Sequence, residues 1–373
     1  MKIYSRYIIK NLFGPVLFVT LTLTSVIWLV QALQYISYIV NRGLPTLDFL
    51  GLVILLMPSV IGLILPIACL CATIYIYNRL TYDSEILVMK AAGISRFGAA
   101  KPAIILFMAV ACAGYGISLY LLPVTYRVFK TEQVEMRDNY AALLLEEGVF
   151  NTPVENIAVY VGERDKDGTL KGILVHDSRS PDKPVTWMAK SGKIVKAGKS
   201  VRFVLENASS QQVNRANGEV RILYFDSYPF DISIYAGGDD TRVRKKDERF
   251  LHELFNPEDK VSKSERERFF AEGHERIIWP LYNLVLPLVA IGMMLSGDFN
   301  RRGQSKRILA VVAISITIII LGFATKSVVA RGNTHLAFIM YMPMLGGLLF
   351  AFYSLLSSKR LNFFSKKHFR KPA

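Results

Sequence analysis

The chain has 373 residues, of which 52% are hydrophobic and 20% are charged, and its formal net charge is +15. This apolar content is too high for an ordinary soluble protein of this length and indicates a membrane protein with a sizeable water-facing part. Orientation in the membrane and attraction to anionic headgroups explain an excess of Lys and Arg in such a protein, so the charge does not indicate nucleic acid.

The cysteines exclude two kinds of site. Cys69, Cys71 and Cys112 all fall in apolar segments, so the polar middle of the chain has no disulfide framework. No His and Cys cluster has metal-ligand spacing, and neither a metal nor a cofactor is expected. The basic stretch Met1–Lys10 precedes an apolar run that is too long for a secretory signal, which indicates a retained span.

Six apolar segments are long enough, at about 20 residues or more, to cross a hydrocarbon core as helices. The second contains Pro58 and Pro66, which would kink it and leave backbone groups for neighbouring spans to satisfy. No carboxylate lies within the six segments, so a proton relay lacks its usual groups. The segments are Leu12–Val40, Phe49–Tyr77, Pro102–Leu122, Ile277–Leu295, Ile308–Val329 and Leu336–Leu356.

The short loops differ in their content of Lys and Arg, which orients the spans. These residues are frequent before the first span, between the second and third, between the fourth and fifth, and after the sixth. The two short loops on the other side contain only Arg42 and Arg331. Both termini and the segment Leu80–Ser95 are therefore predicted to face the cytoplasm, and the polar region between spans three and four to face outward.

That polar region has the alternating pattern of strands. Between Leu144 and Ala236, short β-branched or aromatic runs recur at roughly 10-residue spacing. Turn pairs such as Asp167-Gly168 and Asn217-Gly218 separate some of them. The pattern predicts an all-β sandwich or open roll, followed by a charged and partly helical stretch that returns to the membrane.

The segment Leu80–Ser95 is too polar to cross the membrane and predicts a short amphipathic helix. Ser84 fits an N-cap, Gly93 fits a stop, and Ile86 and Met89 form an apolar side. A short charged helix between two spans suits the docking of another protein at the membrane surface. An ordinary interfacial loop helix explains this stretch equally well.

No stretch predicts catalysis. Gly192–Ser200 resembles a phosphate-binding loop, but it has one residue too many between its glycines and no following helix, so hairpin turns explain it. His274-Glu275 is not followed by the second histidine of a zinc helix, and no Ser or Cys lies in a nucleophile elbow. If the protein performs work, the energy is expected from a partner.

Polar residues beside the spans have two interpretations. Gln31 and Gln34 lie one turn apart near the outer end of the first span, and Lys326 and Arg331 lie near that of the fifth. They could line a pocket for an anionic amphiphile, with the two cations at its phosphates. Snorkelling cations and hydrogen bonds between helices explain the same residues.

These parts, in this order, resemble the permeases of lipopolysaccharide export, the LptF/LptG family. Three spans, an outer β domain and three further spans match, and Ser84–Ser95 is similar to that family's cytoplasmic coupling helix. The form of this stretch looks closer to LptF than to LptG. Weaker similarities are Tyr7-Ile-Ile-Lys10, Glu275-Arg276-x-x-x-Pro280 and Arg301-Arg302-Gly303.

The resemblance implies a polytopic α-helical membrane protein with six transmembrane helices and an inserted periplasmic all-β, jellyroll-like domain. Residues 1–123 would contain spans one to three with the coupling helix at 80–95, and residues 124–275 the β domain with charged linkers. Residues 276–357 would contain spans four to six, and 358–373 a basic cytoplasmic tail.

The resemblance also implies the non-catalytic permease subunit of an ABC transporter in a Gram-negative inner membrane. The chain would pair with a homologous LptG-like permease on two copies of a cytoplasmic LptB-like ATPase. The pair would extract lipopolysaccharide, which would enter between span one of one permease and span five of the other. An LptC-like single-span protein and an LptA-like periplasmic bridge would receive it, and no nucleic acid would be a partner.

Site residues are implied in two places. Glu85 would contact the ATPase, with its neighbours shaping the helix. Family members often carry basic residues where this chain has glutamines near the end of span one, which shifts the expected phosphate contact to the cations of span five. The coupling residues would be Ser84, Glu85, Met89 and Gly93, and the lipid-binding residues Gln31, Gln34, Lys326 and Arg331.

Three other classes compete with this interpretation. The first is the permease of a different ABC system, acting on lipoproteins or cell-wall components. The second is a non-transporting membrane scaffold or sensor, which the absence of an evident cytoplasmic signalling domain disfavours. The third is a membrane enzyme, for which the sequence offers no catalytic constellation.

Overall fold

The computed structural model divides the chain into two compact units. The first contains Met1–Ile36, Val53–Arg127 and Arg244–Ala373, and the second contains Ser37–Leu52 and Val128–Val243. The residues that the structure describes are 3–36, 46–141, 147–154, 156–165, 169–178, 184–197, 200–214, 219–231, 244–257, 261–296 and 304–356. Arg301–Gly303, the tail 358–373 and the turn pairs at 167–168 and 217–218 lie outside them.

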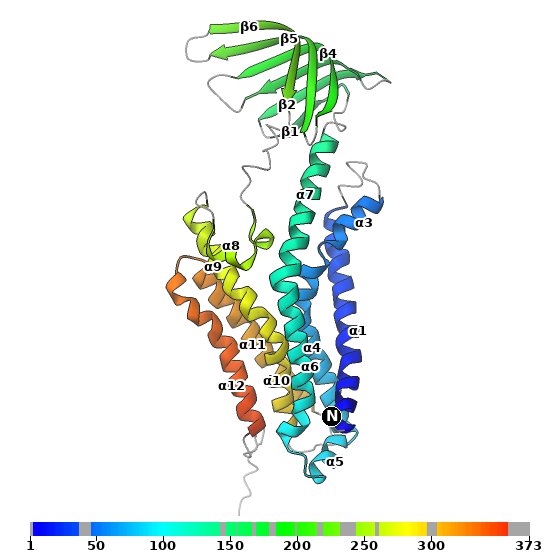
Figure 1. Cartoon of the computed structure of the whole chain (residues 1–373), viewed down its shortest axis with the longest axis vertical. Helices are drawn as coiled ribbons and strands as arrows, with labels where there is room; N and C mark the ends of the chain where they lie inside the picture. The colour runs from blue at the N-terminus through cyan, green and yellow to red at the C-terminus, as the bar shows by residue number, and fades with distance from the viewer. Residues whose placement is uncertain are drawn as a thin grey trace, which may run out of the picture. The chain divides into compact units, whose positions relative to one another are not determined.

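The first unit is a helical bundle (Figure 1). Its N-terminal part consists of α1 (Ile3–Gln34), α4 (Met57–Tyr82), α5 (Glu85–Ala91), α6 (Arg96–Gly116), the π-helical turn η1 (Ile117–Leu121) and the start of α7 (Leu122–Ala141). Its C-terminal part consists of η3 (Lys246–Glu248), α8 (Leu251–Phe255), α9 (Lys263–Ile278), η4 (Trp279–Leu281), α10 (Tyr282–Leu295), α11 (Ser305–Val329), η5 (Thr334–Tyr341) and α12 (Met342–Leu356).

Within the described residues, six helical stretches are long and apolar enough to cross a membrane, which confirms the predicted number. Several extend beyond the predicted apolar segments, because a helix can continue its hydrogen-bond ladder past the hydrocarbon. The stretches are Ile3–Gln34, Met57–Tyr82, Arg96–Gln133, Lys263–Leu295, Ser305–Val329 and Thr334–Leu356. The fourth stretch therefore includes Glu272 and Glu275, which precede the predicted apolar segment Ile277–Leu295.

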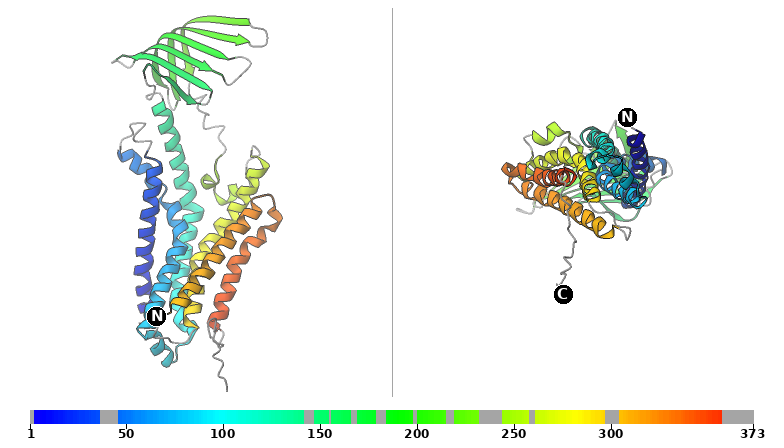
Figure 2. Two further views of the ribbon diagram at one scale, coloured as in Figure 1. Left: turned by 180° about the vertical axis from the view of Figure 1, so that it is seen from behind. Right: turned by 90° about the horizontal axis from the view of Figure 1, so that it is seen from below.

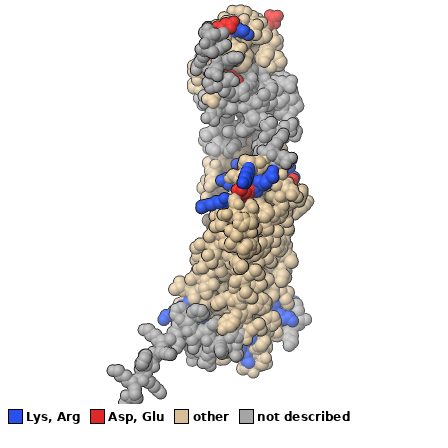
Figure 3. Space-filling model, turned by 90° about the vertical axis from the view of Figure 1, so that its left-hand side faces the viewer, with Lys and Arg blue, Asp and Glu red and all other residues tan. Residues whose placement is uncertain are grey.

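The distribution of charge on the surface agrees with a membrane-crossing bundle. On the face shown in Figure 3, a broad band of the helical unit carries no Lys, Arg, Asp or Glu, and charged residues gather at either side of it. Large apolar side chains are exposed on this unit, such as Phe18 on α1 and Leu309 on α11. Exposed apolar helix faces without charge are those that lipid can cover.

The centre of the bundle is α10, in which every residue is buried. This helix packs against α4, α6, α11 and α12. A helix that is apolar on all sides requires neighbours on all sides, and α10 therefore holds the two halves of the helical unit together. Gly292 lies where α10 and α12 meet, and a Cβ at that position would run into the Ser354 hydroxyl and approach the Ala351 carbonyl oxygen to 3.2 Å.

The two prolines of the second predicted span act differently. Pro58 lies in the first turn of α4, where its missing N–H leaves no unpaired carbonyl, and the predicted kink there is instead a break between α3 (Thr46–Ile54) and α4. Pro66 lies inside α4 and cannot donate to Gly62 O. The Trp279 indole Nε1 donates to that carbonyl at 2.9 Å. A neighbouring span thus satisfies the freed group, as predicted.

The second unit contains one antiparallel sheet in which six strands pair in sequence order. Figure 1 shows an open, curved layer, which agrees with the open roll that the alternation predicts. One face of the early strands is the core, with Ile157, Val159 and Val161 all buried. The strands are β1 (Phe150–Val154), β2 (Ile157–Arg164), β3 (Leu170–Asp177), β4 (Val185–Ala197), β5 (Ser200–Asn214) and β6 (Glu219–Asp231).

The stretch Gly192–Ser200 belongs to this sheet. Gly192 lies inside β4, Ser200 begins β5, and Ala197 pairs with Ser200 across the hairpin. The described part of this stretch is therefore strand on both sides, without the helix that a phosphate-binding loop requires.

Replacement of Gly292 should destabilise the bundle. We expect Gly292→Ala to lower the stability of the detergent-solubilised protein by about 2 kcal/mol, because the added methyl group overpacks the contact between α10 and α12. Gly346→Ala is the control, since its Cβ meets nothing within 4 Å and alanine favours the helix. Thermal unfolding followed by circular dichroism would check this, and equal midpoints for the two variants would contradict the packing assigned to Gly292.

Candidate functional site

The helix α5 (Glu85–Ala91) begins directly after Ser84, as the sequence predicts, but the Ser84 side chain does not cap it. Ser84 occupies the N-cap position with a left-handed backbone (φ 61°), and its side chain makes no capping hydrogen bond. The predicted end is confirmed. Gly93 has φ +80°, its N–H donates to Lys90 O, and the next N–H donates to Met89 O. These two bonds form the Schellman arrangement, which favours glycine at this position.

Contacts tie α5 to several helices of the bundle. Ile86 is buried in the core and Met89 packs against it, as predicted for the apolar side. The Tyr7 hydroxyl on α1 donates to Glu85 Oε1 at 2.9 Å. The Lys90 ammonium donates at 3.3 Å to Leu295 O, a carbonyl at the C-terminal end of α10. A displacement of α5 would therefore act on α1 and α10 as well as on the two helices that it joins.

The opposite face of α5 is exposed. Leu87 and Val88 are 49% and 66% exposed, and Tyr82 at the end of α4 is 78% exposed. Leu87 thus belongs to the outward surface of α5 and not to the apolar side that carries Ile86 and Met89. Figures 1 and 2 show the start of α1 beside α5 at this end of the helical unit, which we call the α5 end.

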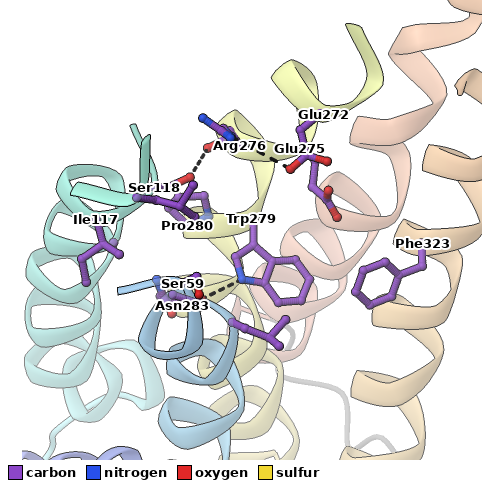
Figure 4. A pocket seen from close by; sticks show the side chains of 14 residues that line it. Ser59, Ile117, Ser118, Glu272, Glu275, Arg276, Trp279, Pro280, Asn283 and Phe323 are labelled. Carbon is purple, nitrogen blue, oxygen red and sulfur yellow. Dashed lines mark hydrogen bonds and ion pairs between the residues drawn. The ribbon is translucent and has the colours of Figure 1, made fainter. Parts of the chain in front are cut away.

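A half-open pocket of about 150 Å³ lies nearer the other end of the unit, where α8 is found (Figure 4). Helices α4, α6, α7, α9, α10 and α11 and the turns η1 and η4 contribute to its wall. The π-helical geometry of η1 breaks the regular ladder beside the pocket, a feature that is frequent at functional sites. The lining residues are Ser59, Gly62, Leu63, Gly114, Ile117, Ser118, Leu122, Glu272, Glu275, Arg276, Trp279, Pro280, Asn283 and Phe323.

The wall of the pocket combines aromatic rings with buried polar groups. The rings of Trp279 and Phe323 lie 5.5 Å apart between centroids. Asn283 is buried, and its Oδ1 has no hydrogen-bond partner among the described residues. The absence of a side chain at Gly114 leaves room for Asn283, because a Cβ at residue 114 would lie 2.7 Å from Asn283 Nδ2. An unpaired buried amide oxygen is costly, so the pocket suits a polar occupant or water.

At the edge of the pocket, one carboxylate oxygen holds two lysines. Glu272 Oε2 lies 2.9 Å from Lys326 Nζ on α11 and 3.0 Å from Lys246 Nζ on η3. Glu275, one turn further along α9, also pairs with Lys326. Figure 4 shows the two carboxylates next to each other beside the pocket. We call Lys246, Glu272, Glu275 and Lys326 the charge cluster.

Arg276 anchors the segment that precedes α9. It is 3% exposed, its NH1 donates at 2.6 Å to Arg249 O, and its NH2 donates at 2.8 Å to Lys246 O. These bonds hold the backbone that carries Lys246 against α9. The charge of Arg276 also lies 4.0 Å from Glu272, which adds to the positive surroundings of that carboxylate.

The comparison with known proteins agrees with this architecture. The profile of the family described as lipopolysaccharide export system permease LptF/LptG matches residues 6–357. The chain belongs to the LptF/LptG family. It is also similar to Uncharacterized protein RP871 of Rickettsia prowazekii (strain Madrid E), with 29% identity over 369 residues, 97% of this chain and 100% of that protein.

Family membership has a general consequence. The chain is a multi-pass membrane protein and a permease of lipopolysaccharide export, with six spans and an inserted all-β domain. As a transporter membrane subunit, it belongs to a class that is generally non-catalytic.

The structure divides the four predicted lipid-binding residues of this family member between two faces. Gln31 and Gln34 lie on α1, which packs on α4 and α6. Lys326 lies in the last turn of α11, which packs on α9, α10 and α12, and Arg331 follows two residues after that helix. Gln34 and Arg331 are exposed. Lys326 is not a free cation but part of the charge cluster. Binding of lipid by any of the four stays a prediction.

Sequence reasoning missed the carboxylate at the centre of the cluster. Glu272 falls in the charged stretch before the predicted span, so hydropathy alone assigned it to water. A positional signal was available: Glu272, Arg276, Trp279 and Asn283 recur at helical spacing and form a polar stripe that continues into an apolar helix. Polar residues on one face of a membrane helix indicate a buried partner or a cavity.

A second ion pair fixes the segment that leads to α8. Glu253 accepts hydrogen bonds from the Phe250 N–H at 2.7 Å and from Arg127 on α7, and the Arg127 guanidinium lies 4.4 Å from the centre of the Phe250 ring. Burial alone would raise the pKa of Glu253, but these hydrogen bonds and the charges of Arg127 and Arg244 lower it below its ordinary value of 4.5.

This lowered pKa predicts a dependence of stability on pH. The charged form is favoured in the folded protein, so the contribution of Glu253 is complete above about pH 5 and is lost as the pH falls through the lowered pKa. We expect Glu253→Gln to reduce stability by about 1 kcal/mol at neutral pH, and the difference from wild type to shrink in acid. Thermal unfolding of both proteins between about pH 3 and pH 7, a range that spans the titration of a carboxylate, would measure this difference in stability.

The control for this measurement is Glu132→Gln, which removes an exposed carboxylate on α7. Its midpoint should follow that of wild type at every pH. A difference between Glu253→Gln and wild type that is equally large in acid and at neutral pH would contradict the assigned ionisation.

Proposed function

We propose that this permease is one of two homologous transmembrane subunits of an ABC transporter that extracts lipopolysaccharide from a Gram-negative inner membrane. Two copies of a cytoplasmic LptB-like ATPase would dock at the α5 end, and both termini would lie in the cytoplasm. The unequal distribution of Lys and Arg over the loops supports this orientation. We also retain the division into residues 1–123, 124–275, 276–357 and 358–373 as part of the proposal.

The observation that carries the proposal is the attachment of α5. Its exposed face, with Leu87 and Val88, is available to a partner, while its other face is held in the core by Ile86. The hydrogen bonds of Glu85 and Lys90 connect the same short helix to α1 and α10. Closure of an ATPase dimer could then move several spans as a rigid body. In this proposal Ser84, Glu85, Met89 and Gly93 are the coupling residues.

The opposite half of the unit supports lipid handling. The pocket is bordered by the charge cluster, so aromatic and apolar surface lies next to a cation that can meet a phosphate. The lipid would enter between α1 of one permease and α11 of the other, which agrees with the separation of Gln31 and Gln34 from Lys326 and Arg331 in this chain.

The sheet offers a route for transfer. It is open, and its last strand, β6, pairs with β5 on one side only among the described strands. Side chains of β6 such as Ile222 and Tyr224 are exposed. An apolar edge strand suits stacking with a similar domain by strand addition, and we propose LptC-like and LptA-like jellyrolls as recipients.

Glu85→Ala tests the coupling. We expect ATP hydrolysis by the reconstituted complex to continue while lipopolysaccharide release falls about tenfold or more, because α5 loses the acidic group at its exposed end. Asp83→Ala, which removes a nearby carboxylate outside the proposed coupling set, is the matched control. Normal transport by Glu85→Ala would count against α5 as the coupling helix.

Lys326→Ala tests the lipid contact. Removal of the cation should lower lipopolysaccharide crosslinking to the permease about tenfold without loss of the bound ATPase. Lys306→Ala, at the other end of α11, removes a cation far from the pocket and should have no such effect. Equal crosslinking in Lys326→Ala and wild type would exclude this residue as a lipid ligand.

Purification in gentle detergent tests the whole assignment. A stoichiometric ATPase, a second six-span permease and lipopolysaccharide are the expected companions. An ATPase together with lipoprotein, and no second such permease, would instead favour an ABC system for lipoproteins. Recovery of the folded chain without any ATPase would favour a membrane scaffold.

A further inference from the structure

We infer that residues 244–255 form a strap that holds two walls of the pocket together, and that the pair of Arg127 with Glu253 is the point at which the strap releases. The inference goes beyond the proposed function, because it concerns the walls of the pocket and not what binds between them. Arg127 and Glu253 are positioning residues in this inference, since they act on the pocket through the strap.

The two walls belong to different parts of the helical unit. Ile117 and Ser118 on η1, with Leu122 at the start of α7, line one wall, and Arg276 and Trp279 belong to the other. The Ser118 hydroxyl donates to Arg276 O at 3.4 Å, as Figure 4 shows at the edge of the pocket. A hydrogen bond of this length is weak, so it does little to hold the walls together.

The π-helical turn η1 is suited to act as the hinge of the first wall. Before this turn, α6 is held in place, since the Tyr115 hydroxyl donates at 2.7 Å to Ile277 O. A π turn interrupts the regular hydrogen-bond ladder and is a common cause of bending in helices. Arg127 lies six residues after Leu121, the last residue of η1, which is about 9 Å along α7. A contact made by Arg127 therefore controls the angle of this wall.

One end of the strap is fixed to α9. The Arg276 guanidinium donates at 2.6 Å to Arg249 O and at 2.8 Å to Lys246 O, and its side chain is only 4% exposed. The Lys246 ammonium in turn lies 3.0 Å from Glu272 on α9. Separation of these groups would leave a buried charge without its partners, so the strap is expected to stay on α9.

The other end of the strap is held by α7 and is more accessible to water. Arg127 Nε donates to Glu248 O at 2.6 Å, and its guanidinium pairs with Glu253. The side chains of this pair are 30% and 25% exposed. Water competes for ion pairs that are partly exposed, so this contact breaks more easily than those of Arg276. A strap that releases here parts from α7 and remains on α9.

Both ends of the strand-bearing segment are tied to the release point. The segment Val128–Val243 contains the six strands, follows directly after Arg127 and ends directly before Arg244. Glu253 contacts both of these boundary residues: one oxygen pairs with Arg127, and the other lies 3.7 Å from Arg244 NH1. A displacement of either end of the segment therefore acts on this carboxylate, and through the strap on the pocket.

The pocket contains a group that favours opening. Asn283 is buried, and its Oδ1 has no hydrogen-bond partner among the described residues. A wider pocket would admit water to this oxygen and so lower the free energy of the open state. The strap then selects between a closed and an open state of similar free energy, and the contacts of Arg127 favour the closed one.

Fluorescence of Trp279 tests the inference, because this indole lines the pocket. The full-length chain would be placed in nanodiscs with its two other tryptophans replaced, Trp28→Phe and Trp187→Phe, and quenching by acrylamide would be measured. We expect Arg127→Ala to raise the quenching constant about threefold, because the released wall exposes the indole. Arg127→Lys keeps the charge but loses the two-point contact, and should give a smaller rise.

A second reporter separates opening of the pocket from a general loosening of the bundle. A chain with Trp28 as its single tryptophan reports on α1, and its quenching should be equal with Arg127 and with Arg127→Ala. Arg79→Ala is the matched control, since it removes an arginine that pairs with Asp83 near the α5 end. This variant should leave the quenching of Trp279 unchanged.

Reversal of the pair tests whether its charges hold the strap. Arg127→Glu and Glu253→Arg should each open the pocket, and the double variant should recover at least about half of the protection of Trp279. Equal quenching of Trp279 in wild type and in a folded Arg127→Ala or Arg127→Lys variant would overturn the inference. A rise that the Trp28 reporter shares, or a double variant without recovery, would overturn it as well.

Discussion

The shared carboxylate of Glu272 is the interaction on which this part of the structure depends. One oxygen holds Lys326 from α11 and Lys246 from the segment that follows the β region, while Arg276 fixes the backbone of that segment through two carbonyl oxygens. Buried charges persist when they are paired, and loss of Glu272 would remove a carboxylate that both Lys326 and Lys246 contact. The cluster thereby joins α9, α11 and the returning chain beside the pocket.

The same helical unit has a different kind of constraint at the α5 end. There a seven-residue helix is too short to be stable alone, and tertiary contacts hold it in place. Ile86 anchors it in the core, and Glu85 and Lys90 reach α1 and α10. Because α10 is buried along its whole length and also borders the pocket, the two ends of the unit share one central helix. In the proposed transport cycle, this helix is the physical connection between ATPase and lipid.

Some features of the structure differ from the local sequence preferences or lie beyond them, because tertiary structure decides them. Ser84 is a good N-cap residue by composition, yet the sharp turn from α4 into α5 gives it a left-handed backbone without a capping bond. Pro58 suggested a kink, but the chain breaks before it and uses the proline to start α4. The carboxylate partners of Lys326 were not predicted, because they are about 50 residues away in sequence, beyond the reach of local pattern reasoning.

The sequence by itself determined the six spans, the inserted strands and the end of α5 at Gly93. Each of these depends on local hydrophobicity, on a short period or on the backbone freedom of one glycine. Only the tertiary structure decided that Trp279 would satisfy the carbonyl freed by Pro66, and that Glu272 would hold two lysines. Such pairings depend on which helices lie side by side. Many arrangements of six apolar helices bury similar area, so hydropathy does not choose among them, whereas the pairing of buried polar groups does.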